Sequence, residues 1–187
     1  MIITETGIDG LIVVEPQVFE DPRGYFFESY NYKKLEDKGI SIKFYQDNQS
    51  KSSYGVIRGL HYQLNPHSQT KFLRVLQGRV YDVAVDIRRG SPTFGKSFGV
   101  ELTEENKKQL LIPHGFAHGF SVLSKTAVVL YKCDNYYHKE SERGIIYNDP
   151  KLGIDWQIPG KDILVAEKDE VLPDLDNAEI NFDYNGN

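Results

Sequence analysis

One stretch of the sequence, residues 55–63, combines chemically active side chains with an apolar, strand-like run. It contains Arg58, which can bind an anion, and His61, a residue type whose ordinary pKa lies near neutral pH. In a regular strand these two side chains would point to opposite faces, because side chains alternate with a period of two. A β-bulge at Gly59 would shift the alternation and bring both side chains to one face. The stretch therefore predicts one wall of an acid–base site; the alternative is an edge strand with a solvated arginine and a structural histidine.

Acid–base chemistry also needs a proton donor and a group that stabilises developing negative charge. Tyr131 and Lys71, both in predicted strands, are candidates for these roles. Each also has a structural interpretation, because a strand tyrosine commonly packs and a lysine can extend its ammonium group to solvent. Gln46 and Asn48 share one face of a polar strand, where two amides can bind a base or a sugar. An edge strand with solvated amides is the alternative there, and the combination of all these groups favours an enzyme.

Other kinds of catalytic site lack their usual sequence patterns. His61 and His67 are separated by a turn, and His114 and His118 lie in a turn without a nearby glutamate, so no metal-ligand spacing stands out. The serines lie in polar turns without a nucleophile elbow, and no glycine-rich phosphate loop opens a helix. We therefore expect no catalytic metal and no nucleophilic triad.

The composition is typical of one globular, β-rich protein. The 187 residues suit a single domain with a substantial core, and they include twelve tyrosines and ten phenylalanines. The net charge of −5 indicates neither nucleic acid nor an anionic membrane as a partner. Cys133 is the only cysteine, and the sequence has no signal-peptide pattern or long apolar span. We therefore expect a soluble cytoplasmic protein in which Cys133 packs within a strand.

Short apolar runs recur along the chain with turn residues between them. This pattern predicts an all-β sandwich or barrel, for which a jelly roll is the natural candidate. Residues 11–19 and 25–30 are predicted strands joined by a turn, and residues 70–76 and 79–87 predict a hairpin with a tight turn at Gly78.

Two further segments differ from this strand pattern. Asn31 can cap a short surface helix over residues 32–38, which Gly39 would end. From Pro173 onward the chain is acidic and polar, which predicts a weakly ordered tail.

Several motifs are specific when they occur together in this order: FEDPRGYFFE at 19–28, QDN at 46–48, RGLHYQ at 58–63, VDIR at 85–88, GSPTFG at 90–95, PHGFAHGF at 113–120, YK at 131–132 and EKD at 167–169. With them the chain resembles the dTDP-4-dehydrorhamnose 3,5-epimerase family from about Phe19 to Pro173. It departs from the family pattern at Ala166, where a serine is common, and in the loop 64–68. The resemblance implies one domain over residues 1–187, an all-β, cupin-type jelly-roll β-barrel with a few short peripheral helices. Its core would span about residues 11–173, before an acidic C-terminal tail.

The resemblance also implies roles for individual residues. His61 would be the proton-abstracting base, and Asp169 would orient its imidazole. Tyr131 would be the acid on the opposite face of the sugar, and Lys71 would hold the C4 oxygen as it becomes an enolate. The positions that match residues binding the nucleotide, its diphosphate or the sugar are Arg23, Glu28, Gln46, Asn48, Arg58, His118, Glu142 and Lys168.

The activity implied by the resemblance is inversion of C3 and C5 of dTDP-4-dehydro-6-deoxy-D-glucose, in dTDP-L-rhamnose biosynthesis for cell-surface polysaccharides. The family pattern further implies a homodimer that exchanges strands, with no metal or organic cofactor. Alternatives are a single-carbon epimerase or ketoisomerase of a related pathway, a non-catalytic sugar-nucleotide-binding cupin and a metal-dependent cupin oxygenase. The joint presence of His61 and Tyr131 favours catalysis, because a binding module needs neither.

Overall fold

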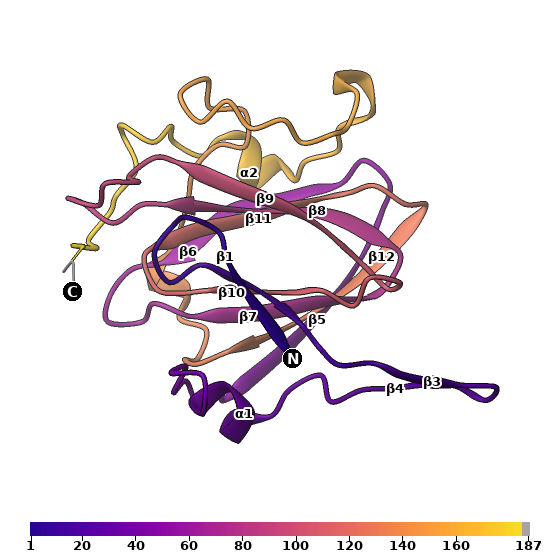
Figure 1. The fold of residues 1–187 in the computed structure, drawn as a ribbon. Coiled ribbons are helices and arrows are strands. Elements are labelled where there is room, and N and C mark those ends of the chain that lie inside the picture. The colour runs from indigo at the N-terminus through magenta and orange to yellow at the C-terminus, as the bar shows by residue number, and fades with distance from the viewer. Residues whose placement is uncertain (185–187) are drawn as a thin grey trace.

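Two antiparallel sheets face each other and enclose the core (Figure 1). The computed structural model describes residues 1–184. The larger sheet contains, from edge to edge, β1 (Ile2–Glu5), β2 (Ile12–Glu15), β10 (Gln109–Ile112), β7 (Lys71–Gln77), β12 (Thr126–Cys133) and β5 (Gln46–Ser53). The smaller sheet contains β13 (Glu142–Gly144), β6 (Ile57–Gln63), β11 (Phe116–Val122), β8 (Arg79–Asp86) and β9 (Ser97–Thr103). The predicted all-β fold is confirmed, although the two sheets stay separate instead of closing into one hydrogen-bonded barrel.

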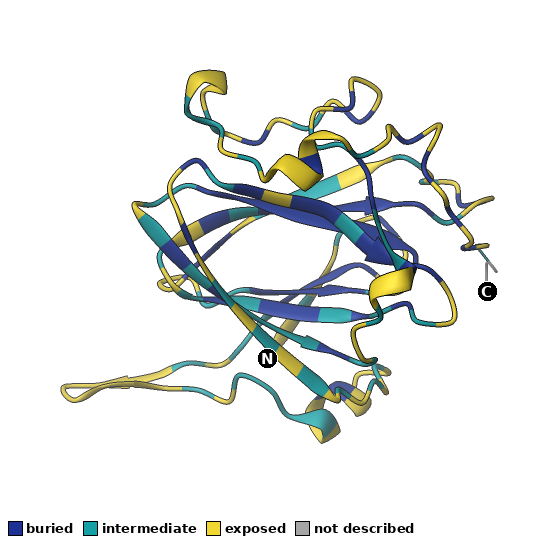
Figure 2. Cartoon of the chain, turned by 180° about the vertical axis from the view of Figure 1, so that it is seen from behind, coloured by how far each residue is buried: buried dark blue, intermediate teal, exposed yellow. Residues whose placement is uncertain are grey.

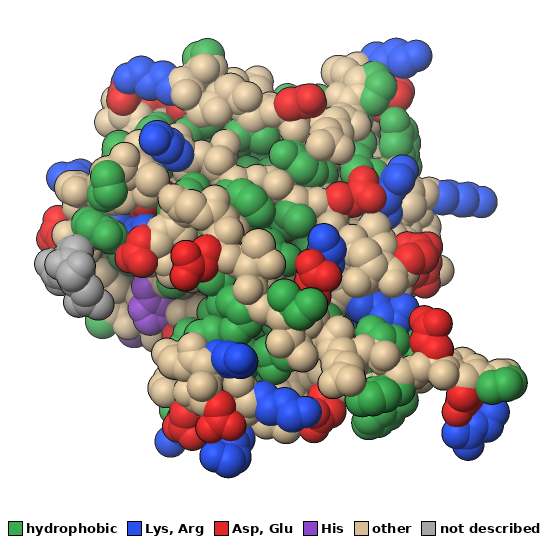
Figure 3. Space-filling model, in the orientation of Figure 1, with side chains coloured by type: hydrophobic (Ala, Val, Ile, Leu, Met, Phe, Trp, Pro, Cys, Tyr) green, Lys and Arg blue, Asp and Glu red, His purple; other side chains and the backbone are tan. Residues whose placement is uncertain are grey.

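A third, two-stranded sheet extends beyond the body of the molecule (Figure 1). It pairs β3 (Phe19–Asp21) with β4 (Gly24–Phe26), and we call residues 19–26 the arm. The predicted strand–turn–strand pattern is confirmed with other bounds: the predicted strand 11–19 divides into β2 and β3, and the strand predicted over 25–30 spans only Gly24–Phe26. All six strand residues of the arm are exposed, including Phe19, Tyr25 and Phe26. Figure 2 shows the arm in the colour of exposed residues. Figure 3 shows the arm standing clear of the body, with hydrophobic and charged side chains on it. Exposed aromatic residues in such a segment are typical of a surface that packs on another molecule.

The helices are short and peripheral. Helix α1 (Tyr32–Glu36) follows the arm, and the Asn31 side chain accepts a hydrogen bond from the Lys34 N–H, which confirms the predicted cap. The helix ends earlier than predicted, with Asp37 as its C-cap. Helix α2 (Glu167–Glu170) and two 3₁₀ turns, η1 (Lys139–Ser141) and η2 (Gly160–Asp162), complete the set. No helix in residues 1–184 is long and apolar enough to cross a membrane.

The predicted hairpin around Gly78 is wrong. Strands β7 and β8 do form on either side of this turn, but β7 pairs with β10 and β12, whereas β8 pairs with β11 and β9. The turn at Gly78 therefore carries the chain from one sheet to the other. Glu104 and Ser124 accept hydrogen bonds from the backbone N–H groups of the turn, so residues distant in sequence hold the crossover. As a result, the inner faces of β7 and β8 face each other across the core.

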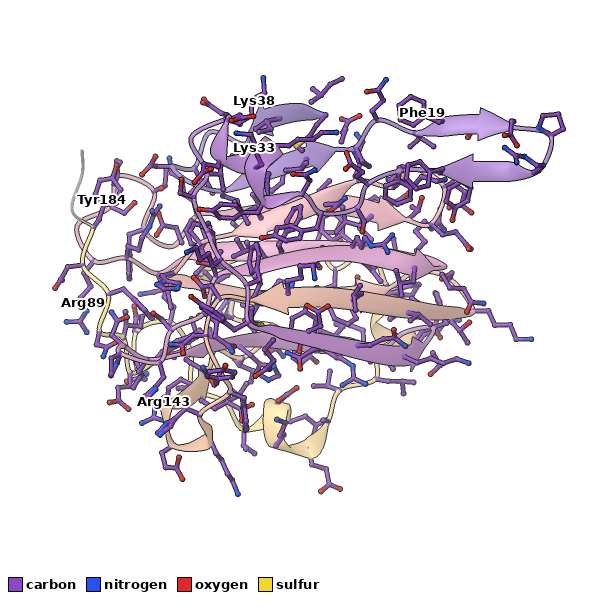
Figure 4. The ribbon with its side chains drawn as sticks, turned by 90° about the horizontal axis from the view of Figure 1, so that it is seen from below. Phe19, Lys33, Lys38, Arg89, Arg143 and Tyr184 are labelled. Atoms are coloured by element: carbon purple, nitrogen blue, oxygen red, sulfur yellow. The ribbon has the colours of Figure 1, made fainter. Side chains whose placement is uncertain are left out.

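The predicted weakly ordered tail is also wrong for the residues that the structure describes. Beyond Pro173 the acidic residues alternate with apolar ones that are buried, among them Ile180 and Phe182. These side chains cover the outer face of the smaller sheet, which would otherwise expose apolar residues to water. Figure 4 shows Tyr184 beside Arg89, whose carbonyl oxygen accepts a hydrogen bond from the Tyr184 N–H at 2.8 Å. The last three residues, 185–187, lie outside the described part.

Candidate functional site

Two cavities between the sheets meet at His61, Lys71 and Tyr131, which line both of them. We call them the large cavity, of about 460 Å³, and the small cavity, of about 190 Å³. The large cavity is also lined by Ser50, Arg58, His118, Phe120, Lys168 and Asp169. The small cavity is also lined by Gln46, Asn48, Gln63, Phe116, Tyr137 and Glu142. Most of the residues that the sequence analysis selected therefore come together around one central trio.

A β-bulge at Gly59 places Arg58 and His61 on the same cavity. His61 of β6 lies opposite His118 of β11, and Arg58 lies opposite Phe120. Arg58 and His61 are three residues apart, whereas their partners are two apart, so β6 has one extra residue here. Gly59 adopts a φ of +116°, which glycine tolerates and other residues rarely adopt. The predicted bulge, and the shared orientation that it produces, are confirmed.

Replacing Gly59 with alanine should reduce the free energy of unfolding by about 2–4 kcal/mol. An added Cβ would lie 2.5 Å from Gly119 Cα and 2.6 Å from the His118 oxygen, and the positive φ adds strain. Urea denaturation of wild type and variant measures the effect. Gly160→Ala is the control, since its Cβ would meet no atom within 4 Å. Equal denaturation midpoints for Gly59→Ala and wild type would contradict this bulge geometry.

His61 is held by a carboxylate from α2. Its Nε2 lies 2.8 Å from Asp169 Oδ1, and the Asp169 side chain is only 4% exposed. Burial opposes the charge on Asp169, but the hydrogen bond and the positive charge available on His61 outweigh it, so the pKa of Asp169 lies below its ordinary value. With Nε2 donating to the carboxylate, Nδ1 carries the lone pair that can accept a proton.

The lowered pKa of Asp169 predicts how stability depends on pH. A carboxylate whose pKa is lower in the folded state stabilises the fold above its unfolded pKa, and this stabilisation is lost as the pH falls through the folded pKa. Asp169→Asn should therefore lower the free energy of unfolding by about 1–3 kcal/mol at pH 7. The difference from wild type should shrink as the pH drops below the ordinary value of 3.8.

Urea denaturation curves recorded from pH 7 to pH 3 test this expectation. Glu170→Gln is the matched control, because Glu170 belongs to the same helix but is exposed. A destabilisation by Asp169→Asn that stayed constant down to pH 3 would contradict the hydrogen-bonded pairing of an ionised Asp169 with His61.

Tyr131 and Lys71 approach the centre from the larger sheet, whereas His61 approaches from the smaller one. Lys71 lies opposite Cys133 in the pairing of β7 with β12, and Tyr131 lies opposite Leu73. Burial lowers the pKa of Lys71 and raises the pKa of Tyr131. In both residues burial disfavours the charged form of the side chain. A ligand between the sheets would meet a base on one face and a phenol on the other.

Polar side chains at the small cavity are already connected to one another. Gln46 Nε2 donates to Asn48 Oδ1 at 3.1 Å, and Gln46 Oε1 accepts from the Tyr137 N–H. Glu142 accepts from the Tyr137 hydroxyl at 2.6 Å and from Lys168 Nζ at 3.2 Å. The Tyr137 hydrogen bond is the main cause of the lowered pKa of Glu142. The sequence analysis missed Tyr137; its only signal was the aromatic pair that it forms with Tyr136 shortly before Glu142.

At the large cavity, a buried carboxylate supports His118. His118 Nε2 lies 3.0 and 3.1 Å from the two carboxylate oxygens of Asp82, and both residues are buried. Arg58 Nε donates to Ser52 Oγ at 2.9 Å. Ser50 Oγ, on the same cavity, is buried without a hydrogen-bond partner among the described residues, and is therefore free to bond a ligand. The sequence analysis did not select Asp82 or Ser50.

Two of the predicted site residues do not reach either cavity within this chain. Arg23 lies on the arm, where its guanidinium pairs with Asp21 at 2.6 Å and its side chain is 90% exposed. Glu28, just after the arm, pairs with Lys34. Ten of the twelve predicted site residues thus surround the cavities, and the two that do not are in or next to the arm.

The arrangement suits proton abstraction next to a carbonyl group. A histidine oriented by a carboxylate can act as a general base, and a buried ammonium group can stabilise an enolate oxygen. Arg58 and Lys168 add positive charge at the large cavity, which can bind an anionic part of a ligand.

Comparisons with known proteins agree with this chemistry. The family model for dTDP-4-dehydrorhamnose 3,5-epimerase matches residues 5–177. A protein of that name from Shigella flexneri is 52% identical over 170 residues, which cover 90% of this chain and 93% of that protein. The crystal structure of such an enzyme from Elizabethkingia anophelis has a TM-score of 0.90 at 53% identity, and covers 95% of this chain and 97% of its own.

A second solved structure includes a ligand. It is a dTDP-6-deoxy-D-glucose-3,5-epimerase from Legionella pneumophila in complex with dTDP-4-keto-L-rhamnose. Its TM-score is 0.90 at 51% identity, and the match covers 94% of this chain and 93% of that one. These structures confirm the predicted cupin-type jelly roll.

Proposed function

Because this chain belongs to the dTDP-4-dehydrorhamnose 3,5-epimerase family, we propose that it inverts C3 and C5 of dTDP-4-dehydro-6-deoxy-D-glucose. The observation that carries the proposal is the position of His61 and Tyr131 on opposite sheets, with Lys71 between the two cavities. Inversion needs a base on one face of the sugar and an acid on the other, and a binding module needs neither.

Each inversion is a pair of proton transfers. His61 takes the proton from the carbon next to the C4 ketone, and the electron pair of the broken C–H bond delocalises onto the C4 oxygen. The Lys71 ammonium stabilises the resulting enolate, and Tyr131 then gives its hydroxyl proton to the carbon from the opposite face. His61 has gained one proton and Tyr131 has lost one, so exchange with water restores both before the second carbon reacts.

The nucleotide part of the substrate would be bound by polar groups around the cavities. Arg58 and Lys168 supply charge for the diphosphate, and the linked amides of Gln46 and Asn48 supply donors and acceptors. Ser50 Oγ supplies one more unsatisfied hydroxyl. A cytoplasmic location, in dTDP-L-rhamnose biosynthesis for cell-surface polysaccharides, is supported by the single, buried cysteine and by the nucleotide-linked substrate.

Incubation with dTDP-4-dehydro-6-deoxy-D-glucose in deuterated water, without a reductase, tests the function. Proton NMR follows deuterium incorporation at C3 and C5. We expect incorporation at both carbons. Incorporation at one carbon would identify a single-carbon epimerase, and none at either carbon with dTDP binding intact would identify a binding module.

We also propose a homodimer in which the arm of each subunit completes the site of the other. The exposed aromatic residues of the arm, and the position of Arg23 and Glu28 in or next to it, support this assembly. In such a dimer the site that uses His61 of one chain uses Arg23 of the partner subunit.

Mixed dimers should reveal this exchange by complementation. His61→Ala and Arg23→Ala subunits, each impaired alone, should regain exchange activity when co-refolded, because one site of the mixed dimer has both residues. Mixing His61→Ala with Lys71→Met subunits is the control, since these residues serve the same site and no intact site can form. Equal activity of the two mixtures would contradict the exchanged arm.

A further inference from the structure

Asp82 is a buried carboxylate that the proposed reaction does not use. It lies on β8 with no exposed surface, and it lines neither cavity. Both of its oxygens lie within hydrogen-bond distance of His118 Nε2, and His118 does line the large cavity. A ligand can therefore meet His118 but not Asp82, so any role of Asp82 acts through its neighbours.

Lys71 is the second residue through which Asp82 can act. Lys71 and Asp82 lie on the inner faces of β7 and β8, which the crossover at Gly78 places opposite each other: Leu73 and Val75 of β7 share one core cluster with Val80 and Ala84 of β8. Among the described residues no ion pair or side-chain hydrogen bond holds the ammonium group of Lys71, which lines both cavities. A buried ammonium group without a nearby negative charge tends to lose its proton.

The titratable groups that act on this part of the core come from five strands: Asp82 on β8, Cys133 and Tyr131 on β12, Glu142 on β13, His118 on β11, and Arg58 and His61 on β6. Burial raises the pKa of Cys133 to about 11, so its thiol is uncharged at neutral pH. Glu142 already bonds Tyr137 and Lys168. Asp82 is therefore the carboxylate that remains to balance the charge of Lys71.

We propose that Asp82 is a positioning residue for the part of the site that binds the C4 oxygen of the substrate. Asp82 accepts a hydrogen bond from His118 Nε2, and its negative charge keeps Lys71 cationic. The proposal rests on the function given above, since it concerns the group that stabilises the enolate. In this arrangement Lys71 is an ammonium ion, Asp82 is a carboxylate and His118 is neutral. Burial alone raises the pKa of Asp82 and lowers the pKa of Lys71, and each charge opposes the shift of the other. Together the three groups have no net charge, which costs less free energy than one unbalanced charge in a medium of low dielectric constant. Burial also lowers the pKa of His118, in agreement with its neutral form.

Competitive labelling with acetic anhydride tests the proposal without relying on activity. The extent of Lys71 acetylation, measured by mass spectrometry across pH, gives the midpoint at which Lys71 loses its proton. In Asp82→Asn this midpoint should fall by about 1–3 pH units, because the balancing charge is gone. Asp149→Asn is the matched control, since Asp149 is equally buried but bonds the backbone of Lys151 and Leu175 outside the cavities.

Each result either supports or overturns the proposal. If Asp82 were protonated, asparagine would be close to isosteric and the Lys71 midpoint would not move, which would overturn the proposal. An equal shift of the Lys71 midpoint in the Asp149→Asn control would also overturn it. If Asp82→Asn does not fold, the wild type decides, because a Lys71 midpoint below pH 7 would mean that Asp82 does not keep it cationic.

The exchange assay in deuterated water adds a readout that distinguishes the two proposals. The rate of deuterium exchange should fall at alkaline pH as Lys71 loses its proton. In Asp82→Asn this fall should occur at lower pH than in the wild type, by the same number of pH units as the labelling midpoint. A uniform loss at all pH values would overturn the charge-balancing role. Absence of exchange in the wild type would refute the epimerase function, while the labelling midpoints would still decide the role of Asp82.

Discussion

Replacement of His61 by alanine should abolish deuterium exchange at both C3 and C5 while leaving dTDP binding intact. The imidazole belongs to the central trio, lines both cavities and is oriented by the buried Asp169 carboxylate, whereas His118 lines the large cavity alone. General-base catalysis contributes about 10²- to 10⁴-fold, so the rate should fall by at least that much. Exchange at C3 and C5 should fall together, because one base serves both carbons.

The control for this variant is His114→Ala. His114 is also paired with a carboxylate, Asp134 at 2.9 Å, but it lines neither cavity. The His114→Ala variant should retain a rate of deuterium exchange close to that of the wild type. Isothermal titration with dTDP separates loss of chemistry from loss of binding. Substantial exchange at either carbon in His61→Ala would remove His61 from the role of base.

Replacement of Lys71 by methionine should lower kcat by about 10²- to 10³-fold, the cost of removing one preorganised oxyanion-stabilising group. Methionine has nearly the same length, so the cavities should keep their shape. The change should appear in kcat far more than in KM, because the charge on the C4 oxygen develops in the transition state. Lys132→Met, on the same sheet but paired with Asp47, should have little effect on either constant.

The stability of Lys71→Met provides an independent check. Because methionine removes the charge that balances the buried Asp82 carboxylate in the arrangement proposed above, the variant should have a lower free energy of unfolding than the wild type at pH 7. Loss of activity together with a single cooperative urea transition would show that the variant is folded. An unimpaired kcat would contradict the enolate-stabilising role.

Several features of this protein could be predicted from the sequence because they depend on neighbouring residues. The strand-forming runs, the Asn31 cap and the arm hairpin follow from local backbone preferences. The bulge at Gly59 is also local, since a glycine between Arg58 and His61 is what changes the alternation of side chains. The family motifs added residue roles that these local preferences could not supply.

Other features were decided only by the tertiary structure. A glycine turn serves a hairpin and a crossover equally well, so the sequence around Gly78 could not reveal which strands β7 and β8 would join. That choice depends on burying the inner faces of both sheets at once. The same holds for the tail: its acidic residues predict disorder, but Ile180 and Phe182 find an apolar sheet face to cover.

The candidate site depends on both kinds of information. His61 stands out in its own strand, but its partner Asp169 is 108 residues further along the chain. The sequence shows Asp82 only as a carboxylate within a predicted strand. The pairing of β8 with β11 in the smaller sheet gives Asp82 His118 as its partner. The sequence by itself determined which residue types lie on which strand face, because backbone alternation is local. Which faces meet was decided by the tertiary structure, because strand partners are chosen by long-range burial of apolar surface.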